Sequence, residues 1–158
     1  PHPDVRRRGG DEPVRALLQR VSGCAVRSGG HEVSRIGPGL LVLLGVAASD
    51  GEADVDFIVG KVINLRVFDD AEGRLNLSLA ETGGELMVVS QFTLYGDARK
   101  GRRPSYIEAA TPERAKELYE LACERFAAAG FPPERGVFQA RMEVELINDG
   151  PVTLMLES

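Results

Sequence analysis

The sequence predicts one α/β domain, with α+β character, in which two helices pack on a mainly antiparallel or mixed sheet. Its 158 residues suit a single domain, and neither an internal repeat nor an interior linker divides them. Hydrophobic residues make up 43% and charged residues 27% of the chain, which is typical of a globular protein. Short apolar segments of strand character surround two stretches in which apolar residues recur at helical spacing.

The first half of the chain begins with strands and ends with a helix. Gly29-Gly30 separates two short strand-like segments and predicts a hairpin turn. Residues 40–46 are apolar at consecutive positions, which favours a strand buried on both faces. The expected elements are a strand at 14–21, hairpin strands at 23–27 and 32–36, a strand at 40–46 and a helix at 52–65.

The second half continues with a buried strand, a loop, a helix and two closing strands. Thr111 can cap a helix and Pro112 suits its first position, while Gly130 ends the apolar stripe. Residues 148–151 (NDGP) all favour turns, so by themselves they predict a turn. The expected elements are a strand at 85–94, a polar loop at 96–105, a helix at 111–130 and strands at 141–147 and 152–156.

Charge, cysteine content and hydropathy exclude several classes of protein. The 24 acidic residues outnumber the 19 lysines and arginines, which argues against a general nucleic-acid coat but permits one local basic patch. The apolar run at 40–48 is too short to span a bilayer, so no membrane partner is expected. Cys24 and Cys123 lie far apart without a CxxC motif, which favours reduced thiols in a cytoplasmic protein. Residues 1–13 are rich in proline, glycine and charge and have no periodicity, which predicts a flexible leader before a domain at 14–158. No apolar stretch follows their arginines, so a secretion signal is not expected.

The segment SQFT places polar side chains at the end of a buried strand. Ser90, Gln91 and Thr93 would be costly to bury without hydrogen-bond partners, and functional residues tend to lie where a strand meets a loop. The alternative is that threonine is simply a good strand former and that Ser90 bonds the backbone. Composition alone leaves both interpretations open.

Four cations cluster within five residues of the polar loop: Arg99, Lys100, Arg102 and Arg103. Arginine binds phosphate through two parallel hydrogen bonds, and the intervening glycine lets the backbone approach. The alternative is an ordinary solvated loop. Because the rest of the chain is acidic, the cluster favours phosphate binding.

Other catalytic schemes have little support. The only histidines are His2 and His31, which disfavours histidine as a general base. The P-loop, dinucleotide-binding and HExxH zinc motifs are absent, so neither a metal nor a cofactor is expected.

Two segments resemble the signature motifs of the D-aminoacyl-tRNA deacylase family: VVSQFTLYGDARKGRRPS at 88–105 and INDGPVTLMLES at 147–158. The segments VRALLQRVSGCAV, IGPGLLVLLGV and KVINLRVF…GRLNLSL match the family's pattern too, in collinear order over residues 14–158. The resemblance implies that family's fold, in which a mainly antiparallel or mixed sheet forms a barrel-like core.

The resemblance also implies an activity and a set of site residues. Members of the family hydrolyse the ester that joins a D-amino acid to the terminal adenosine of tRNA, and they remove glycine misplaced on alanine tRNA. They are cytoplasmic homodimers without a metal or organic cofactor, and the 2′-hydroxyl of the tRNA assists the reaction. The implied catalytic positions are Ser90, Gln91 and Thr93, and the implied substrate-binding positions are Phe92, Gly150 and Pro151. The Gly-Pro bond is implied to be cis and to reach into the partner subunit's site, where it rejects L-amino acids.

Two alternatives accompany this interpretation. A related deacylase tolerates L-alanine, but its first motif starts with proline and carries alanine at the position of Phe92, so Ser90 and Phe92 favour the D-specific form. A non-catalytic tRNA-binding module of the same fold is the other alternative, and the two intact motifs argue against it.

Overall fold

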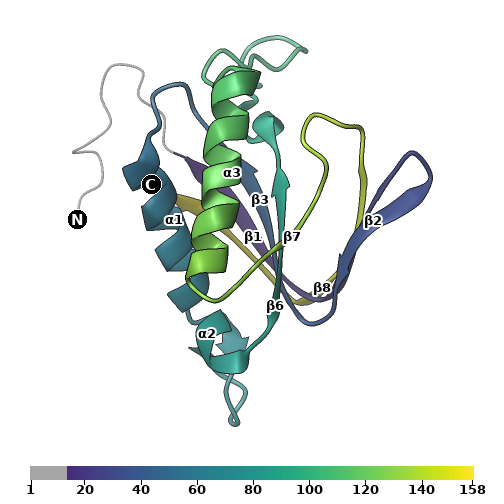
Figure 1. Cartoon of the computed structure of the whole chain (residues 1–158), viewed down its shortest axis with the longest axis vertical. Coiled ribbons are helices and arrows are strands. Elements are labelled where there is room, and N and C mark those ends of the chain that lie inside the picture. The colour runs from purple at the N-terminus through teal and green to yellow at the C-terminus, as the bar shows by residue number, and fades with distance from the viewer. Residues whose placement is uncertain (1–13) are drawn as a thin grey trace.

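The computed structural model describes residues 14–158 as one mixed sheet, nearly closed into a barrel, with helices on its outer face (Figure 1). The leader expected at 1–13 lies outside the described residues. The strands are β1 (Arg15–Ser28), β2 (His31–Ile36), β3 (Gly39–Gly45), β4 (Phe68–Asp69), β5 (Leu75–Leu77), β6 (Glu85–Ser90), β7 (Glu134–Arg135) and β8 (Glu143–Glu157). The helices are α1 (Glu52–Asn64), α2 (Leu79–Thr82), α3 (Pro112–Ala128) and the 3₁₀ helix η2 (Phe92–Tyr95). The predicted fold class is confirmed.

β1 is the central strand of the sheet. It pairs antiparallel with β8 along one edge, and with β3 and then β2 along the other. β6 runs parallel to β3, and β7 runs parallel to β6. The sheet curves until β2 approaches β7, where the hydroxyl of Ser34 donates a hydrogen bond to the main-chain carbonyl of Arg135 at 2.7 Å. β4 and β5 form a separate two-stranded sheet.

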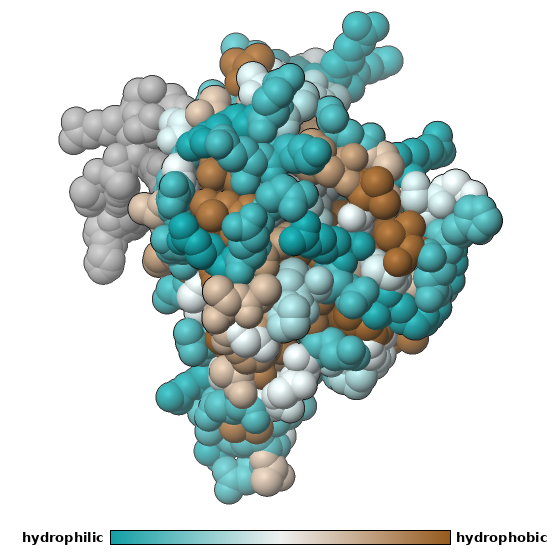
Figure 2. All heavy atoms as spheres, in the orientation of Figure 1, coloured by the Kyte–Doolittle hydropathy of each residue, from teal (hydrophilic) through white to brown (hydrophobic). Residues whose placement is uncertain are grey.

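β3 separates the two parts of the hydrophobic core. Leu40, Val42 and Leu44 pack with buried residues of α1 and α3, whereas Leu41 packs with Met87 in a second cluster inside the barrel. The expectation that this strand is buried on both faces is therefore confirmed. α1 and α3 lie side by side over the sheet, and Figure 2 shows that the face they form toward solvent is mainly hydrophilic.

Two expected breaks in strands are absent. The two strands expected before residue 28 form one strand, β1, and the turn expected at residues 148–151 lies inside β8, so both expectations were wrong. The physical reason is that β1 and β8 pair on both sides of the interruption. Val21 pairs with Asn148, and Gln19 pairs with Thr153 after an irregularity in register. The strand ladder therefore overrides the local turn preference.

The strand expected at 85–94 and the number of helices are also corrected. β6 ends at Ser90, because the chain turns into η2 after the amide of Gln91 bonds the carbonyl of Leu44 at 2.8 Å. The structure has a third α-helix, α2, where two were expected. A capping box between Ser78 and Glu81 starts α2, and its four residues are too few to show a helical period in the sequence.

Candidate functional site

The turn η2 is anchored at its C-terminal end. Tyr95 is buried, and its hydroxyl donates to the main-chain carbonyl of Gly45 at 3.1 Å. A Cβ at Gly45 would lie 2.9 Å from Cε2 of Tyr95, so the close approach of β3 and η2 requires glycine. Arg15 donates from Nη1 to the carbonyl of Leu94 at 2.9 Å, and its guanidinium lies 4.9 Å from the centre of the Tyr95 ring. Two strands, β1 and β3, therefore fix this turn.

The structure brings the SQFT residues together at the opposite, exposed end of the turn. Ser90 and Gln91 are half-buried, while Phe92 and Thr93 are exposed. The side-chain amide of Gln91 donates to the hydroxyl of Thr93. Within residues 14–158 no carboxylate, histidine or lysine bonds this hydroxyl, so none of these residues is placed as its general base.

The main chain of η2 offers a second kind of group. The first N–H groups of a helix have no intrahelical acceptor, and in η2 these belong to Phe92 and Thr93. Fixed main-chain donors can stabilise an oxyanion without any titratable side chain. The turn is therefore better equipped for positioning and hydrogen bonding than for acid–base chemistry.

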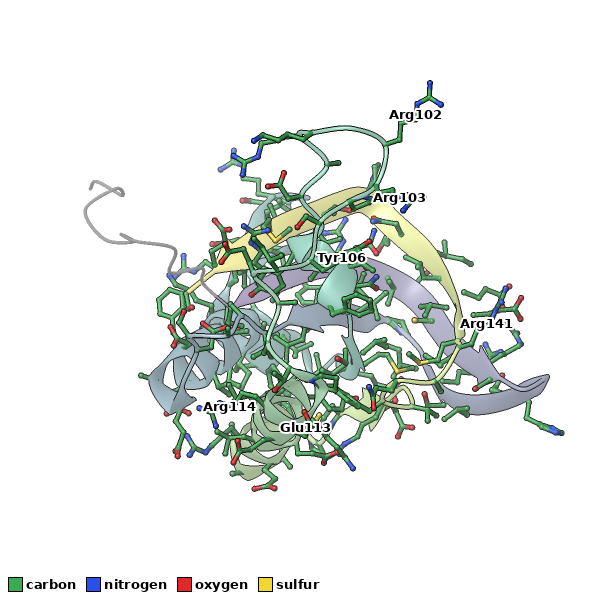
Figure 3. The ribbon with its side chains drawn as sticks, turned by 90° about the horizontal axis from the view of Figure 1, so that it is seen from above. Arg102, Arg103, Tyr106, Glu113, Arg114 and Arg141 are labelled. Carbon is green, nitrogen blue, oxygen red and sulfur yellow. The ribbon has the colours of Figure 1, made fainter. Side chains whose placement is uncertain are left out.

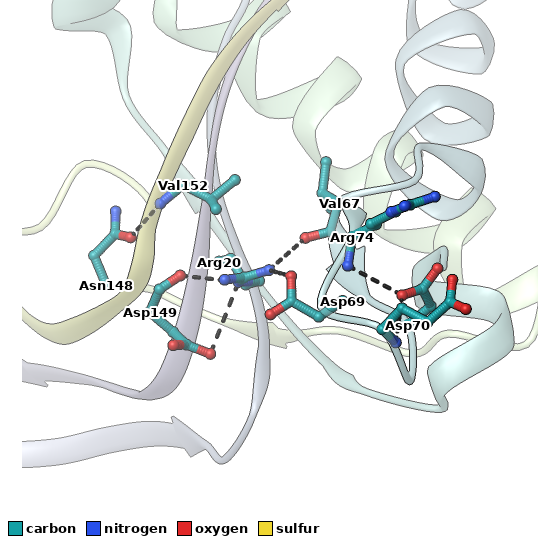
Figure 4. A network of polar contacts seen from close by, with 9 residues as sticks. Arg20, Val67, Asp69, Asp70, Arg74, Asn148, Asp149 and Val152 are labelled. Carbon is teal, nitrogen blue, oxygen red and sulfur yellow. Dashed lines mark hydrogen bonds and ion pairs between the residues drawn. The ribbon is translucent and has the colours of Figure 1, made fainter. Parts of the chain in front are cut away.

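Gly150-Pro151 lies inside β8, and its peptide bond is cis, as the resemblance implied. Both residues are exposed. The side chain of Asn148 accepts a hydrogen bond from the amide of Val152 at 2.8 Å (Figure 4). It also donates one to the hydroxyl of Thr153 at 2.8 Å, so it links the two sides of Gly150-Pro151. Gly150 has a φ of +135°, and a Cβ there would lie 2.8 Å from Cγ2 of Val152, so glycine is required.

Arg20 holds the same segment from the adjacent strand, although it was not among the predicted site residues. It is only 7% exposed, and its guanidinium donates to the main-chain carbonyls of Asp149 and Val67, each at 2.9 Å (Figure 4). It also pairs with the carboxylate of Asp69 at 3.2 Å. The sequence did contain a signal that Arg20 is buried. Ala16, Leu18 and Arg20 occupy alternate positions of β1 and therefore share one face of the strand, which is buried. A charged residue at an inward position needs such partners.

Within one chain, the two predicted motifs lie against different residues of β1. η2 lies at the Arg15 end of β1, whereas Gly150 lies close to Arg20. Arg15 and Arg20 are five residues apart along β1, so their Cα atoms are about 17 Å apart at 3.4 Å per residue.

The basic loop is closed at its base and charged at its tip. The amide of each of Asp97 and Ser105 bonds the carbonyl of the other, at 2.8 and 2.9 Å. The guanidinium of Arg99 binds the carboxylate of Asp97 through two hydrogen bonds, at 2.9 and 2.7 Å. These bonds, with one from the amide of Arg99, lower the pKa of Asp97 to about 2. The guanidinium of Arg99 therefore stabilises the loop from within.

The other three cations of the loop remain available. Lys100, Arg102 and Arg103 are exposed, and none of them forms an ion pair with another described residue. Figure 3 shows Arg102 extending away from the body of the molecule. Three cations in one exposed loop suit a polyanion.

Other features of the described part of the chain do not add to this site. Residues 14–158 contain no group of three or more metal-ligating side chains, and none of their helices has the length and apolar character needed to cross a membrane. Both cysteines are buried thiols, and burial raises the pKa of Cys123 to about 11. A hollow of about 300 Å³ lies near Gly84 and Pro132, at the opposite end of β6 from η2.

Comparison with known proteins gives concordant results. A family model described as D-Tyr-tRNA(Tyr) deacylase matches residues 17–157. A D-aminoacyl-tRNA deacylase from Myxococcus xanthus is 59% identical over 145 residues, which are 92% of this chain and 95% of that protein. A solved structure titled c-Myc DNA Unwinding Element Binding Protein is 38% identical, with a TM-score of 0.87 over 91% of this chain and 98% of that one. A structure titled as a probable eukaryotic D-amino acid tRNA deacylase has a TM-score of 0.78 over 92% and 99% of the two chains at 19% identity, and it shows the fold alone.

Proposed function

This chain belongs to the D-Tyr-tRNA(Tyr) deacylase family, and from that membership we infer that it is a D-aminoacyl-tRNA deacylase, a hydrolase of the aminoacyl-tRNA ester. The observation that carries the proposal is the anchored turn η2, which presents the SQFT motif at the surface of a chain so similar to a deacylase. The substrate is an activated ester, so precise positioning and one or two oxyanion donors suffice for its hydrolysis.

The proposed catalytic groups are the main chain of η2 and the side chains around it. The N–H groups of Phe92 and Thr93 bind the oxyanion that forms on the ester carbonyl. Ser90 and Gln91 orient the substrate and the Thr93 hydroxyl, and Phe92 lines the pocket. The 2′-hydroxyl of the terminal adenosine assists the reaction. The absence of a base beside Thr93 within the described residues supports this division of roles.

Gly150-Pro151 is proposed to reject L-amino acids at the η2 turn of a partner subunit. A rigid stretch of main chain excludes an L side chain by steric contact, whereas a D side chain points away from it. Glycine has no side chain to exclude, so glycyl-tRNA(Ala) is also a substrate. The two motifs lie against different residues of β1, Arg15 and Arg20, and this arrangement supports the contribution of a second subunit.

The proposed homodimer has a candidate surface on β8. Ile147, Leu154 and Met155 of this edge strand are 66%, 39% and 47% exposed, and Leu154 and Met155 lie on opposite faces of the strand. Exposed apolar surface of this kind is typical of subunit interfaces. The tRNA phosphates are proposed to contact the basic loop through Lys100, Arg102 and Arg103. Arg99 supports this loop through its pair with Asp97. The protein is proposed to act in the cytoplasm.

One assay tests the proposed function. Purified protein without added metal is incubated with D-tyrosyl-tRNA, L-tyrosyl-tRNA and glycyl-tRNA(Ala), and the release of each amino acid is measured. We expect hydrolysis of the D-tyrosyl and glycyl esters and protection of the L-tyrosyl ester. Rapid hydrolysis of L-tyrosyl-tRNA would contradict the role of Gly150-Pro151. Binding of all three tRNAs without release from any would favour the non-catalytic alternative.

A further inference from the structure

An exposed aromatic pair lies at the edge of η2. The rings of Phe92 and Tyr106 meet edge to face, with their centres 5.1 Å apart and their planes at 63°. The two residues are 56% and 37% exposed, so much of both rings remains open to solvent. A Cβ at Gly96 would lie 3.0 Å from Cε1 of Tyr106, which means that this ring rests directly on the main chain. The pair is thus a supported surface of two aromatic rings.

This pair lies between η2 and the tip of the basic loop. Tyr106 follows Ser105, which closes the base of the loop by pairing with Asp97. Lys100 and Arg102 lie beyond this closure, at the tip. Figure 3 shows Tyr106 beside the ribbon of η2, with Arg102 at the far end of the loop. The surface therefore presents, in order, the catalytic turn, two aromatic rings and three available cations.

We propose that Phe92 and Tyr106 form a stacking platform for the unpaired nucleotides that precede the terminal adenosine of tRNA. The inference rests on the proposed function, because it assumes that the ester of that adenosine lies at η2. The CCA end of tRNA is single-stranded, so its bases expose faces that can stack on aromatic side chains while its phosphates meet cations. The order of groups on this surface matches the order of groups along such a strand.

The platform is tested with a series of substrates of increasing length. D-tyrosyl-adenosine, D-tyrosyl-CpCpA and D-tyrosyl-tRNA are hydrolysed by wild type and by the variants Tyr106→Leu and Tyr106→Phe. Stacking of one base is strong enough that Tyr106→Leu should lower kcat/KM about tenfold on the two longer substrates. The same variant should leave D-tyrosyl-adenosine almost unchanged, and Tyr106→Phe should retain wild-type rates on all three. Ile107→Ala is the matched control, because Ile107 is the adjacent apolar residue and is 84% exposed.

Binding measurements separate this proposal from the proposed function. An amide-linked D-tyrosyl-CpCpA analogue, which is not hydrolysed, should bind about tenfold more weakly to Tyr106→Leu than to wild type. If that difference is found but wild type hydrolyses none of the esters, the platform stands and the proposed function fails. Equal binding of the analogue by both proteins would overturn the platform. A loss of equal size on D-tyrosyl-adenosine would also overturn it, and so would a change of oligomeric state in Tyr106→Leu measured by sedimentation.

Discussion

The guanidinium of Arg20 donates from Nε to the main-chain carbonyl of Asp149 at 2.9 Å, across 129 positions of the chain. This bond fixes the residue that immediately precedes Gly150. The same guanidinium also donates to the carbonyl of Val67 at 2.9 Å and pairs with Asp69 at 3.2 Å. One buried cation thereby connects β1, the segment before β4 and the proposed selectivity segment of β8.

Arg20→Lys should lower both stability and selectivity. Lysine keeps the charge but lacks the planar fork that reaches several acceptors, so buried carbonyls lose their donors. We expect a loss of about 1–3 kcal/mol in the free energy of unfolding. We also expect a larger relative rise in hydrolysis of L-tyrosyl-tRNA than of D-tyrosyl-tRNA. The control is Arg27→Lys, since Arg27 forms a more exposed pair with Glu145 on the same two strands; equal effects of the two variants would contradict the role given to Arg20.

Thr93→Ala distinguishes a side-chain from a main-chain role. If η2 acts through its N–H groups, the variant should keep much of the wild-type kcat, because the main chain is unchanged. A D-tyrosyl-tRNA that ends in 2′-deoxyadenosine should instead react far more slowly with wild type. Single-turnover rates measure both effects. The opposite pattern, with a large loss of rate in Thr93→Ala alone, would identify the hydroxyl as a nucleophile.

The double variant Arg102→Ala/Arg103→Ala should bind every tRNA more weakly. Each phosphate contact releases counterions, so each lost contact should reduce the slope of log affinity against log salt by about 0.7–0.9. Arg74→Ala provides the control, because Arg74 is an exposed arginine on the turn between β4 and β5. An unchanged slope in the double variant would show that the loop does not contact phosphates and is an ordinary solvated loop.

The Asp97–Arg99 pair should persist over the whole physiological pH range. Hydrogen bonds from Arg99 lower the pKa of Asp97 from 3.8 to about 2. Because the folded-state pKa is depressed, the pair is complete above pH 4 and is lost only as the pH falls through about 2. Side-chain carboxyl resonances followed by NMR should show this midpoint in wild type and a midpoint closer to 3.8 in Arg99→Ala. A wild-type midpoint near 4 would mean that the pair does not form in solution.

Both thiols should resist alkylation in the folded protein. Burial raises the pKa of Cys123 to about 11 and also raises that of Cys24, so little thiolate exists at pH 8. Iodoacetamide should modify neither residue in the native state and both after denaturation, as mass spectrometry would reveal. Rapid native labelling of Cys123 would show that α3 opens readily.

The sequence alone determined the elements whose pattern is local. The consecutive apolar residues of β3 indicated burial on both faces, and Thr111-Pro112 marked the start of α3; the structure confirms both. The SQFT and NDGPVT motifs can also be recognised from the sequence alone, because their resemblance to a family depends on the order of residues and not on contacts. Patterns of this kind involve residues that are close in the chain, so the chain alone displays them.

Only the tertiary structure decided the features that depend on distant residues. β8 continues through residues 148–151 because β1 pairs with it on both sides, which no local turn preference could reveal. Likewise, η2 replaces the end of the expected strand where Tyr95 packs on Gly45 and bonds its carbonyl, 50 positions earlier in the chain. Arg20 is recognised as a site residue for the same reason, since its acceptors come from two distant segments, residues 67–69 and Asp149. Hydrogen-bond partners are chosen by the packing of the whole sheet, and a sequence read position by position does not contain that packing.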